Sequence, residues 1–159
     1  EAYYPVAVAI LDAGLTCTAA IPCPAEMGAS IHINGTGSSI MDTVFVCRHA
    51  DRECDHQEAG AEALAVVVSE DLERLSEGGV ECTRGDARCI AFGQLTRFAV
   101  RGLRQDWDSN LAISEKLARV CGYAQRFGDL SALWARLSTP GARQPSFDFA
   151  GSTSEKLAL

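Results

Sequence analysis

The feature that most constrains this chain is a pair of β-prone runs separated by a long segment of small residues. Residues 15–21 alternate larger apolar with smaller side chains, and residues 43–46 read Thr-Val-Phe-Val. About twenty residues rich in Gly, Ser, Asn and Pro lie between the two runs. This pattern predicts an antiparallel hairpin with a wide loop. Because so long a connection is uncommon in a compact domain unless it binds something, residues 26–41 are the first place to look for function.

A short helix is predicted before the hairpin. Residues 2–13 carry apolar side chains at helical spacing, and Gly14 is a natural stop. The first strand is expected to end at Pro22 and Pro24, because proline cannot donate to a β-ladder. The second strand is expected over residues 42–47.

After the hairpin, the apolar residues take a helical period. One stripe, ended by two glycines, is formed by Leu64, Val68, Leu72 and Leu75. Thr83 followed by Asp86 is typical of a capping box and predicts the start of a helix over residues 85–103. On this second helix, Cys89, Phe92, Leu95, Ala99 and Leu103 form the apolar face.

A third helix is predicted to begin at a cap formed by Ser109 or Asn110 and to be broken at Gly128. Ile113 is expected on its core side. Residues 130–137 predict a short last helix, and residues 139–159 have the composition of a flexible tail.

These patterns predict an α/β N-terminal part followed by a mostly α-helical lobe. The first part is a helix plus two antiparallel strands at the end of a sheet, over residues 1–50. The helical lobe spans residues 51–138, and the tail spans residues 139–159. The charged segment 48–57 marks the predicted boundary.

Charge and cysteine content restrict the classes of partner and compartment. The net charge of −7 argues against a surface that binds nucleic acid over its whole area, so any contact with DNA must be local. The seven cysteines are an odd number without the spacing of a small disulfide scaffold, and the start of the chain does not resemble a signal sequence. We therefore expect reduced thiols and a cytoplasmic protein, with no membrane partner.

The hairpin region also resembles a known family. Residues 14–48 read GLTCTAAIPCPAEMGASIHINGTGSSIMDTVFVCR. The features follow in a fixed order: a helix, a Gly-Leu entry, a strand running into Pro and Glu, a loop with Ser-Ser-Ile, and a strand ending Val-Cys-Arg. This order resembles the end of the catalytic domain of bacterial DNA amino-methyltransferases. The subfamily is that of large adenine-specific DNA methylases. The likeness covers roughly residues 1–48, with weaker similarity over residues 72–97.

The resemblance implies methylation of an exocyclic base amine in DNA, with S-adenosylmethionine as methyl donor. The family's Asp/Asn-Pro-Pro-aromatic catalytic motif and its glycine-containing cofactor loop do not occur in these 159 residues. We therefore expect a C-terminal fragment of a larger enzyme, which forms part of the target-base side of the site and a helical extension. Its partners are then DNA and the rest of the methyltransferase chain, and this segment alone should bind no S-adenosylmethionine.

In such an enzyme the target base is extruded into a pocket, and strands at this end of the sheet help to wall that pocket. The resemblance therefore implies base or backbone contacts for five residues of the hairpin loop, namely Glu26, His32, Asn34, Ser38 and Ser39. The alternative is that they are ordinary turn and cap residues.

A stripe of arginines is the best local match to contacts with the DNA backbone. Arg97, Arg101 and Arg104 are spaced i, i+4 and i+7, on the face of their predicted helix opposite the apolar one. The alternative is a solvated face paired with acids of neighbouring helices.

A possible metal-ligand set lies at the end of the second strand and in the charged segment. Cys47, His49, Cys54 and His56 follow the spacing C-x-H-x4-C-x-H, and thiolates with imidazoles suit tetrahedral zinc. The spacing is not that of a standard zinc finger, and a solvated linker is the alternative, so zinc is not expected.

A second functional class stays open at this point. Without the methyltransferase, the chain is a non-enzymatic helical module that binds a partner, with a linker that zinc would clip if the four ligands are real.

Overall fold

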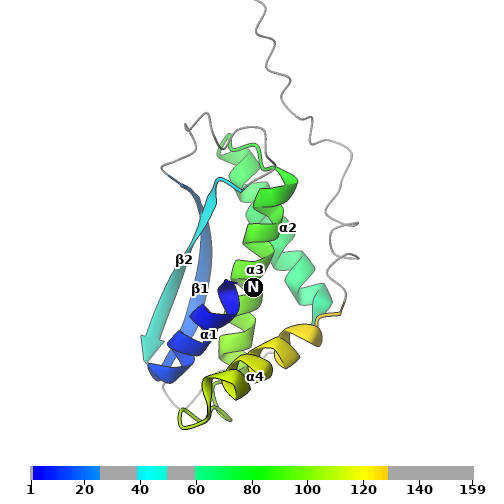
Figure 1. Ribbon diagram of the computed structural model, residues 1–159. Helices are drawn as coiled ribbons and strands as arrows, with labels where there is room; N and C mark the ends of the chain where they lie inside the picture. Colours follow the sequence, from blue (N-terminus) through cyan, green and yellow to red (C-terminus); the bar gives the residue numbers. More distant parts are fainter. Residues whose placement is uncertain (1, 26–38, 50–59, 129–159) are drawn as a thin grey trace, which may run out of the picture.

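The computed structural model describes residues 2–25, 39–49 and 60–128. Its elements follow in the order α1 (Tyr3–Asp12), β1 (Leu15–Pro24), β2 (Met41–His49), α2 (Ala61–Glu77), α3 (Arg84–Leu103) and α4 (Ile113–Gln125). A helix and a two-stranded antiparallel sheet precede a helical part, as predicted (Figure 1). None of the described helices combines the length and hydropathy needed to cross a bilayer. The helix predicted over residues 130–137 and the tail over residues 139–159 lie outside the described residues.

The predicted pairing of residues 15–21 with residues 43–47 is confirmed. The two strands run antiparallel, with Cys17 opposite Cys47 and Ile21 opposite Val44. A β-bulge lies between Cys17 and Ala19 and shifts the register there by one residue. Each strand therefore turns one set of side chains toward the helices and the other set away from them.

The prediction that β1 ends at Pro22 is wrong, because its prolines occupy positions that make no ladder hydrogen bond. The strand continues to Pro24, which lies opposite Met41. One residue further, the Ala25 N–H donates to the Ile40 carbonyl at 2.7 Å. Because hydrogen-bonded and non-hydrogen-bonded pairs alternate in an antiparallel ladder, Pro22 and Pro24 direct their nitrogens away from β2.

The central element is α3, which packs against both strands and against each of the other three helices (Figure 1). The prediction of a single apolar face is wrong for this helix, because neighbours cover it on most sides and even Gln94 and Thr96 are buried. Its approach to the sheet is close at Gly93, where a Cβ would lie 2.8 Å from the Thr43 Cγ2. Only a residue without a side chain fits this contact unless Thr43 shifts.

Two clusters of buried side chains form the core. The first cluster joins α2, α3 and the end of α4 and contains Leu64, Val68, Ile90, Ala91, Leu95, Phe98, Ala124 and Phe127. The second cluster joins α1, β1, α3 and α4 and contains Ala7, Val8, Leu11, Cys17, Ala99, Val100 and Val120. The second cluster includes residues from both sides of the boundary predicted over residues 48–57. The ribbon formed by β1 and β2 therefore packs in one core with helices from the second part of the chain.

The start of α4 differs from its prediction. The helix begins at Ile113 after an extended Ala112, and no side chain caps it. Asn110 is not the cap, because its main-chain and side-chain N–H groups both donate to the Asp108 carboxylate. Ile113, the first residue of the helix, was expected in the core, but it is 63% exposed. The glycine predicted to follow this helix, Gly128, has a φ of 75°.

The buried carboxylate of Asp86 joins the hairpin to α3. The predicted capping box is confirmed: the Asp86 N–H donates to the Thr83 hydroxyl, and the Thr83 N–H donates to Asp86 Oδ2 at 2.8 Å. The Ser39 hydroxyl and the Ile40 N–H both donate to Asp86 Oδ1, each at 2.8 Å. Burial alone would raise the pKa of Asp86, but the hydrogen bonds from Thr83, Ser39 and Ile40 lower it.

Replacing Asp86 with alanine is expected to lower the free energy of unfolding by about 3 kcal/mol at pH 7, because several buried donors lose their acceptor. A carboxyl whose folded pKa is lowered stabilises the fold above its unfolded pKa of about 3.9, and this contribution is lost as the pH falls through the folded value. The stability difference between wild type and Asp86→Ala should therefore shrink below about pH 4. Urea unfolding followed by circular dichroism measures both effects, and a difference that is small at pH 7 would contradict the assignment.

Candidate functional site

An open cleft of about 520 Å³ lies between β1, α2 and α3. Its apolar lining comes from residues 19–22 of β1 and from Val67 and Leu75 of α2. Its polar lining consists of Glu70, Asp71, Arg74, Gln94 and Arg97. The cleft is open to solvent and combines an apolar wall with a group of polar side chains.

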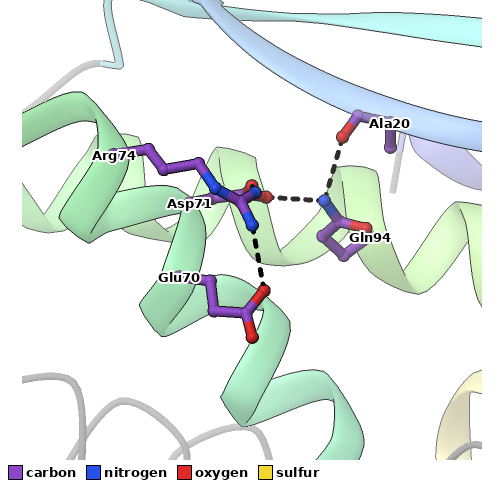
Figure 2. A network of polar contacts seen from close by, with 5 residues as sticks. All are labelled: Ala20, Glu70, Asp71, Arg74 and Gln94. Atoms are coloured by element: carbon purple, nitrogen blue, oxygen red, sulfur yellow. Dashed lines mark hydrogen bonds and ion pairs between the residues drawn. The ribbon is translucent and has the colours of Figure 1, made fainter. Parts of the chain in front are cut away.

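The amide of Gln94 is held in one orientation. Its Nε2 donates to the Ala20 carbonyl at 2.9 Å and to Asp71 Oδ2 at 2.6 Å (Figure 2). Both partners are acceptors, so the nitrogen must lie on that side and the oxygen on the other. Gln94 is only 2% exposed, and its Oε1 has no hydrogen-bond partner. An unsatisfied buried acceptor of this kind costs about 1–3 kcal/mol.

Asp71 connects this amide to the surface of α2. Its Oδ1 accepts a hydrogen bond from Arg74 Nη1 at 3.2 Å, and Arg74 Nη2 lies 3.2 Å from Glu70 Oε2 (Figure 2). Burial raises the pKa of the Asp71 carboxyl, although the hydrogen bond from Gln94 and the charge of Arg74 oppose the shift. The carboxylate is therefore destabilised in its charged form.

Arg97 is the second residue of the cleft with an unsatisfied buried atom. Its Nε is buried without an acceptor, and its guanidinium carbon lies 5.0 Å from the centroid of the Phe98 ring. Burial lowers the pKa of Arg97, and the nearby charge of Arg101 acts in the same direction. Gln94 and Arg97 are one turn apart on α3. The unsatisfied acceptor Gln94 Oε1 and the unsatisfied donor Arg97 Nε therefore belong to residues on the same side of this helix.

Most residues predicted to contact DNA bases from the hairpin loop cannot be placed. Glu26, His32, Asn34 and Ser38 lie outside the described residues. Ser39 is described, and its hydroxyl donates to the buried carboxylate of Asp86 rather than pointing into the cleft.

The predicted zinc ligands are only partly described. Cys47 and His49 lie on β2, whereas Cys54 and His56 fall in the segment 50–59, outside the described residues. In the parts of the chain that the structure describes, no group of three or more His, Cys, Asp or Glu side chains is arranged to hold a metal ion.

The predicted arginine stripe is divided between different surroundings. Arg97 lines the cleft, and Arg101 lies one turn further along α3. Arg104 caps the end of α3, and its side chain reaches the end of α1, where Nη1 donates to the carbonyls of Leu11 at 2.6 Å and Leu15 at 3.4 Å. Contact of these arginines with DNA phosphates stays a prediction, but at least Arg104 also has a role within the fold.

Sequence reasoning missed the two central residues of the cleft. Asp71 lies seven residues after Leu64 and three after Val68, so it occupies the buried stripe of α2. Gln94 lies between Ile90 and Phe98 at intervals of four residues. A polar residue at a core position of an otherwise apolar stripe is the signal that would have pointed to both.

Comparison of the chain with family models, with curated proteins and with solved structures gave no match.

We expect the Asp71→Asn variant to reverse the pH effect described for Asp86. A carboxyl with a raised folded pKa destabilises the fold while it is ionised, and the penalty disappears as the pH falls toward its unfolded pKa of about 3.9. Wild-type protein should therefore gain stability relative to Asp71→Asn as the pH falls from 7 to about 4. Urea unfolding over this range measures the difference, and a difference independent of pH would show that burial does not control this carboxyl.

Arg104→Ala is expected to reduce the free energy of unfolding by about 1.5–3 kcal/mol, because the Leu11 carbonyl in the last turn of α1 and the Leu15 carbonyl at the start of β1 lose a charged donor. Arg119 offers a matched control, since its Nη1 also donates to a main-chain carbonyl, that of Asp106, but at an exposed position. Arg119→Ala should change stability by less than about 0.5 kcal/mol. Equal losses in the two variants, measured by urea unfolding, would remove the capping role of Arg104.

Proposed function

We propose that this chain forms the closing end of the catalytic sheet of an S-adenosylmethionine-dependent DNA methyltransferase that acts on an exocyclic base amine. The observation that carries the proposal is the ribbon of β1 and β2, one edge of which is terminated while the other is open. A helix followed by such a ribbon is also the order that the sequence resemblance implies.

The outer edge of β1 is closed to a further strand. Pro22 and Pro24 direct their nitrogens outward, and neither has an N–H to donate. The carbonyl of Ala20 also points outward in this register, and the Gln94 amide already donates to it at 2.9 Å. A strand added at this edge would find few free main-chain hydrogen-bonding groups over residues 20–24 of β1.

The outer edge of β2 has the opposite character. In the same register the main-chain groups of Thr43 and Phe45 point away from β1, and the described sheet has no strand beside them. An edge with free donors and acceptors is the side at which a sheet can continue. This asymmetry supports a ribbon that ends a larger sheet.

The two faces of the ribbon support the same interpretation. Toward the helices, Phe45 packs against Tyr3 with ring centroids 6.3 Å apart. On the opposite face, Ile21 and Val44 lie opposite one another and are each 49% exposed. Strands that are apolar on both faces are typical of α/β sheets covered by helices on both sides.

In this proposal the chain contributes the part of the active site that contacts the target DNA base, and another part of the enzyme holds the methyl donor. Residues 26–38 join the two strands, and Ser39, which precedes β2, donates to the capping-box carboxylate of α3. DNA is the partner, with backbone contacts from the arginines of α3. When bound, S-adenosylmethionine supplies the methyl group that the base amine receives.

The proposal is tested on the polypeptide as cells produce it. An antibody raised against residues 60–128 is used to purify the polypeptide, which is incubated with duplex DNA and methyl-tritiated S-adenosylmethionine. We expect label in DNA and, after digestion, N6-methyladenine or N4-methylcytosine by mass spectrometry. The control is the same DNA incubated with the purified 159-residue chain, which lacks the catalytic motif and should transfer nothing. An intact polypeptide that transfers no methyl group to DNA would overturn the proposal.

A further inference from the structure

Two cysteines face each other across the ribbon, near the end of β2 at His49. Cys17 and Cys47 are directly opposite in the antiparallel register, and both are free thiols. Cys17 is fully buried in the second core cluster, and Cys47 packs against the same cluster. Both side chains therefore lie on the face of the ribbon that is turned toward the helices.

The hydrogen-bonding pattern of the ladder makes this a close pair. The Ala25 N–H donates to the Ile40 carbonyl, so the main chain of Ile40 faces β1. This direction alternates along β2: the even-numbered residues through Val46 also face β1, whereas the main-chain groups of Cys47 face away. The extra residue of the bulge lies on β1 and leaves the alternation along β2 unchanged. Cys17 and Cys47 are therefore a non-hydrogen-bonded pair, whose Cα atoms are about 4.5 Å apart in a regular ladder.

A disulfide needs an arrangement of this kind. Its two Cα atoms usually lie about 4.4–6.8 Å apart, and its Cβ atoms about 3.5–4.5 Å apart. In a non-hydrogen-bonded pair the Cβ atoms lie at the short end of a range of about 4.5–5.5 Å, and both side chains point to the same face. The two sulfur atoms can therefore be joined with little movement of the backbone.

The two thiols already interact. Burial raises the pKa of Cys17, and the neighbouring Cys47 raises it further through its charge and through a hydrogen bond. The Cys17 Sγ also donates to the Ala19 carbonyl at 3.2 Å. Cys23 lies on the same strand but has Asp42 opposite it, not a thiol. Cys23 is therefore a natural control for the pair.

From this geometry we infer that Cys17 and Cys47 form a reversible disulfide, which acts as a redox-sensitive clamp between β1 and β2. The other end of the ribbon is already fixed, because Ser39 and Ile40 donate to the buried carboxylate of Asp86.

The clamp acts at the end of β2 that is more exposed to solvent. Arg48 and His49, the last residues of this strand, are both exposed. Cys17 is held in the core, so a bond from its sulfur to Cys47 ties the end of β2 to the core through β1. A cross-link also restricts the unfolded chain, so the oxidised form should be the more stable one.

The oxidant is a low-molecular-weight disulfide such as oxidised glutathione. Cys47 reacts first, because it is partly exposed whereas Cys17 is not. Its thiolate attacks one sulfur of the oxidant, which releases one small thiolate and leaves a mixed disulfide on Cys47. The Cys17 thiolate then attacks the Cys47 sulfur and displaces the second small thiolate. The two cysteines lose two protons and two electrons, and the oxidant gains them as two thiols.

The disulfide is tested by oxidising the folded 159-residue chain with mixtures of reduced and oxidised glutathione. Free thiols are blocked with N-ethylmaleimide, and the chain is cut by a glutamate-specific protease without reduction. Cleavage after Glu26 separates Cys17 and Cys23 from Cys47, so a disulfide between the strands gives a linked pair of peptides in mass spectrometry. We expect Cys17 and Cys47 in this pair, and Cys23→Ser should leave the link unchanged.

Two results of this experiment would overturn the inference. The first is the absence of a linked pair at every glutathione ratio. The second is a link from Cys47 to Cys23 as abundant as the link to Cys17, because the register would then not select the partner. The peptide map of the wild-type chain needs no variant, so it is decisive even if a variant fails to fold.

Thermal unfolding tests the clamp. Oxidation should raise the midpoint of the wild-type chain by on the order of 10 °C, and dithiothreitol should reverse the rise. Cys47→Ser should abolish the rise, whereas the matched variant Cys23→Ser should keep it. Equal midpoints for the oxidised and reduced wild-type chain would overturn the clamp.

The order of attack is tested with Cys17→Ala. This variant should retain glutathione on Cys47, because no second thiol displaces it, and a Cys47 that stays unmodified would overturn the order. None of these measurements involves DNA or a methyl donor, so their failure leaves the methyl-transfer experiment unaffected.

Discussion

The fold depends on one buried carboxylate, that of Asp86. It has no exposed surface, and it accepts hydrogen bonds from the main-chain and side-chain groups of Thr83 and from Ser39 and Ile40. A buried charge is tolerated only while such donors surround it, so the residues just before β2 are fixed to the first turn of α3. This sets where β2 begins, and it allows Thr43 to meet the helix at Gly93.

A second set of charges fixes the other end of the ribbon. Arg104 donates to the Leu11 carbonyl of α1 and to the Leu15 carbonyl of β1, and Lys116 pairs with Asp12 at 2.8 Å. The hydrogen bond from Lys116, together with one from Trp107, lowers the pKa of Asp12. Cations at the C-terminus of a helix favour its dipole. Helices α3 and α4 thus hold α1 by charge as well as by apolar packing.

Local signals in the sequence were sufficient to predict most helices and strands, but not to predict which of these elements pack against one another. The capping box at Thr83 and the alternation in β1 depend on neighbours in the chain, so they were predictable. The continuation of β1 through Pro22 depends on which side of the strand faces β2. The burial of α3 on most sides, like the pairing of Gln94 with Asp71, depends on contacts between distant segments. Periodicity assigns a face to each residue but does not say what covers it.

The edge of β1 connects the cleft with the proposed role of the ribbon. A further strand beside β1 would need the N–H groups that Pro22 and Pro24 lack, and would compete with Gln94 for the Ala20 carbonyl. The same residues that stop the sheet at this edge therefore leave space between β1 and α2, where the cleft lies. Extension of the sheet is directed to β2, on the opposite side of the ribbon. The cleft and a strand beside β2 can consequently exist together, because they use opposite edges of one two-stranded unit.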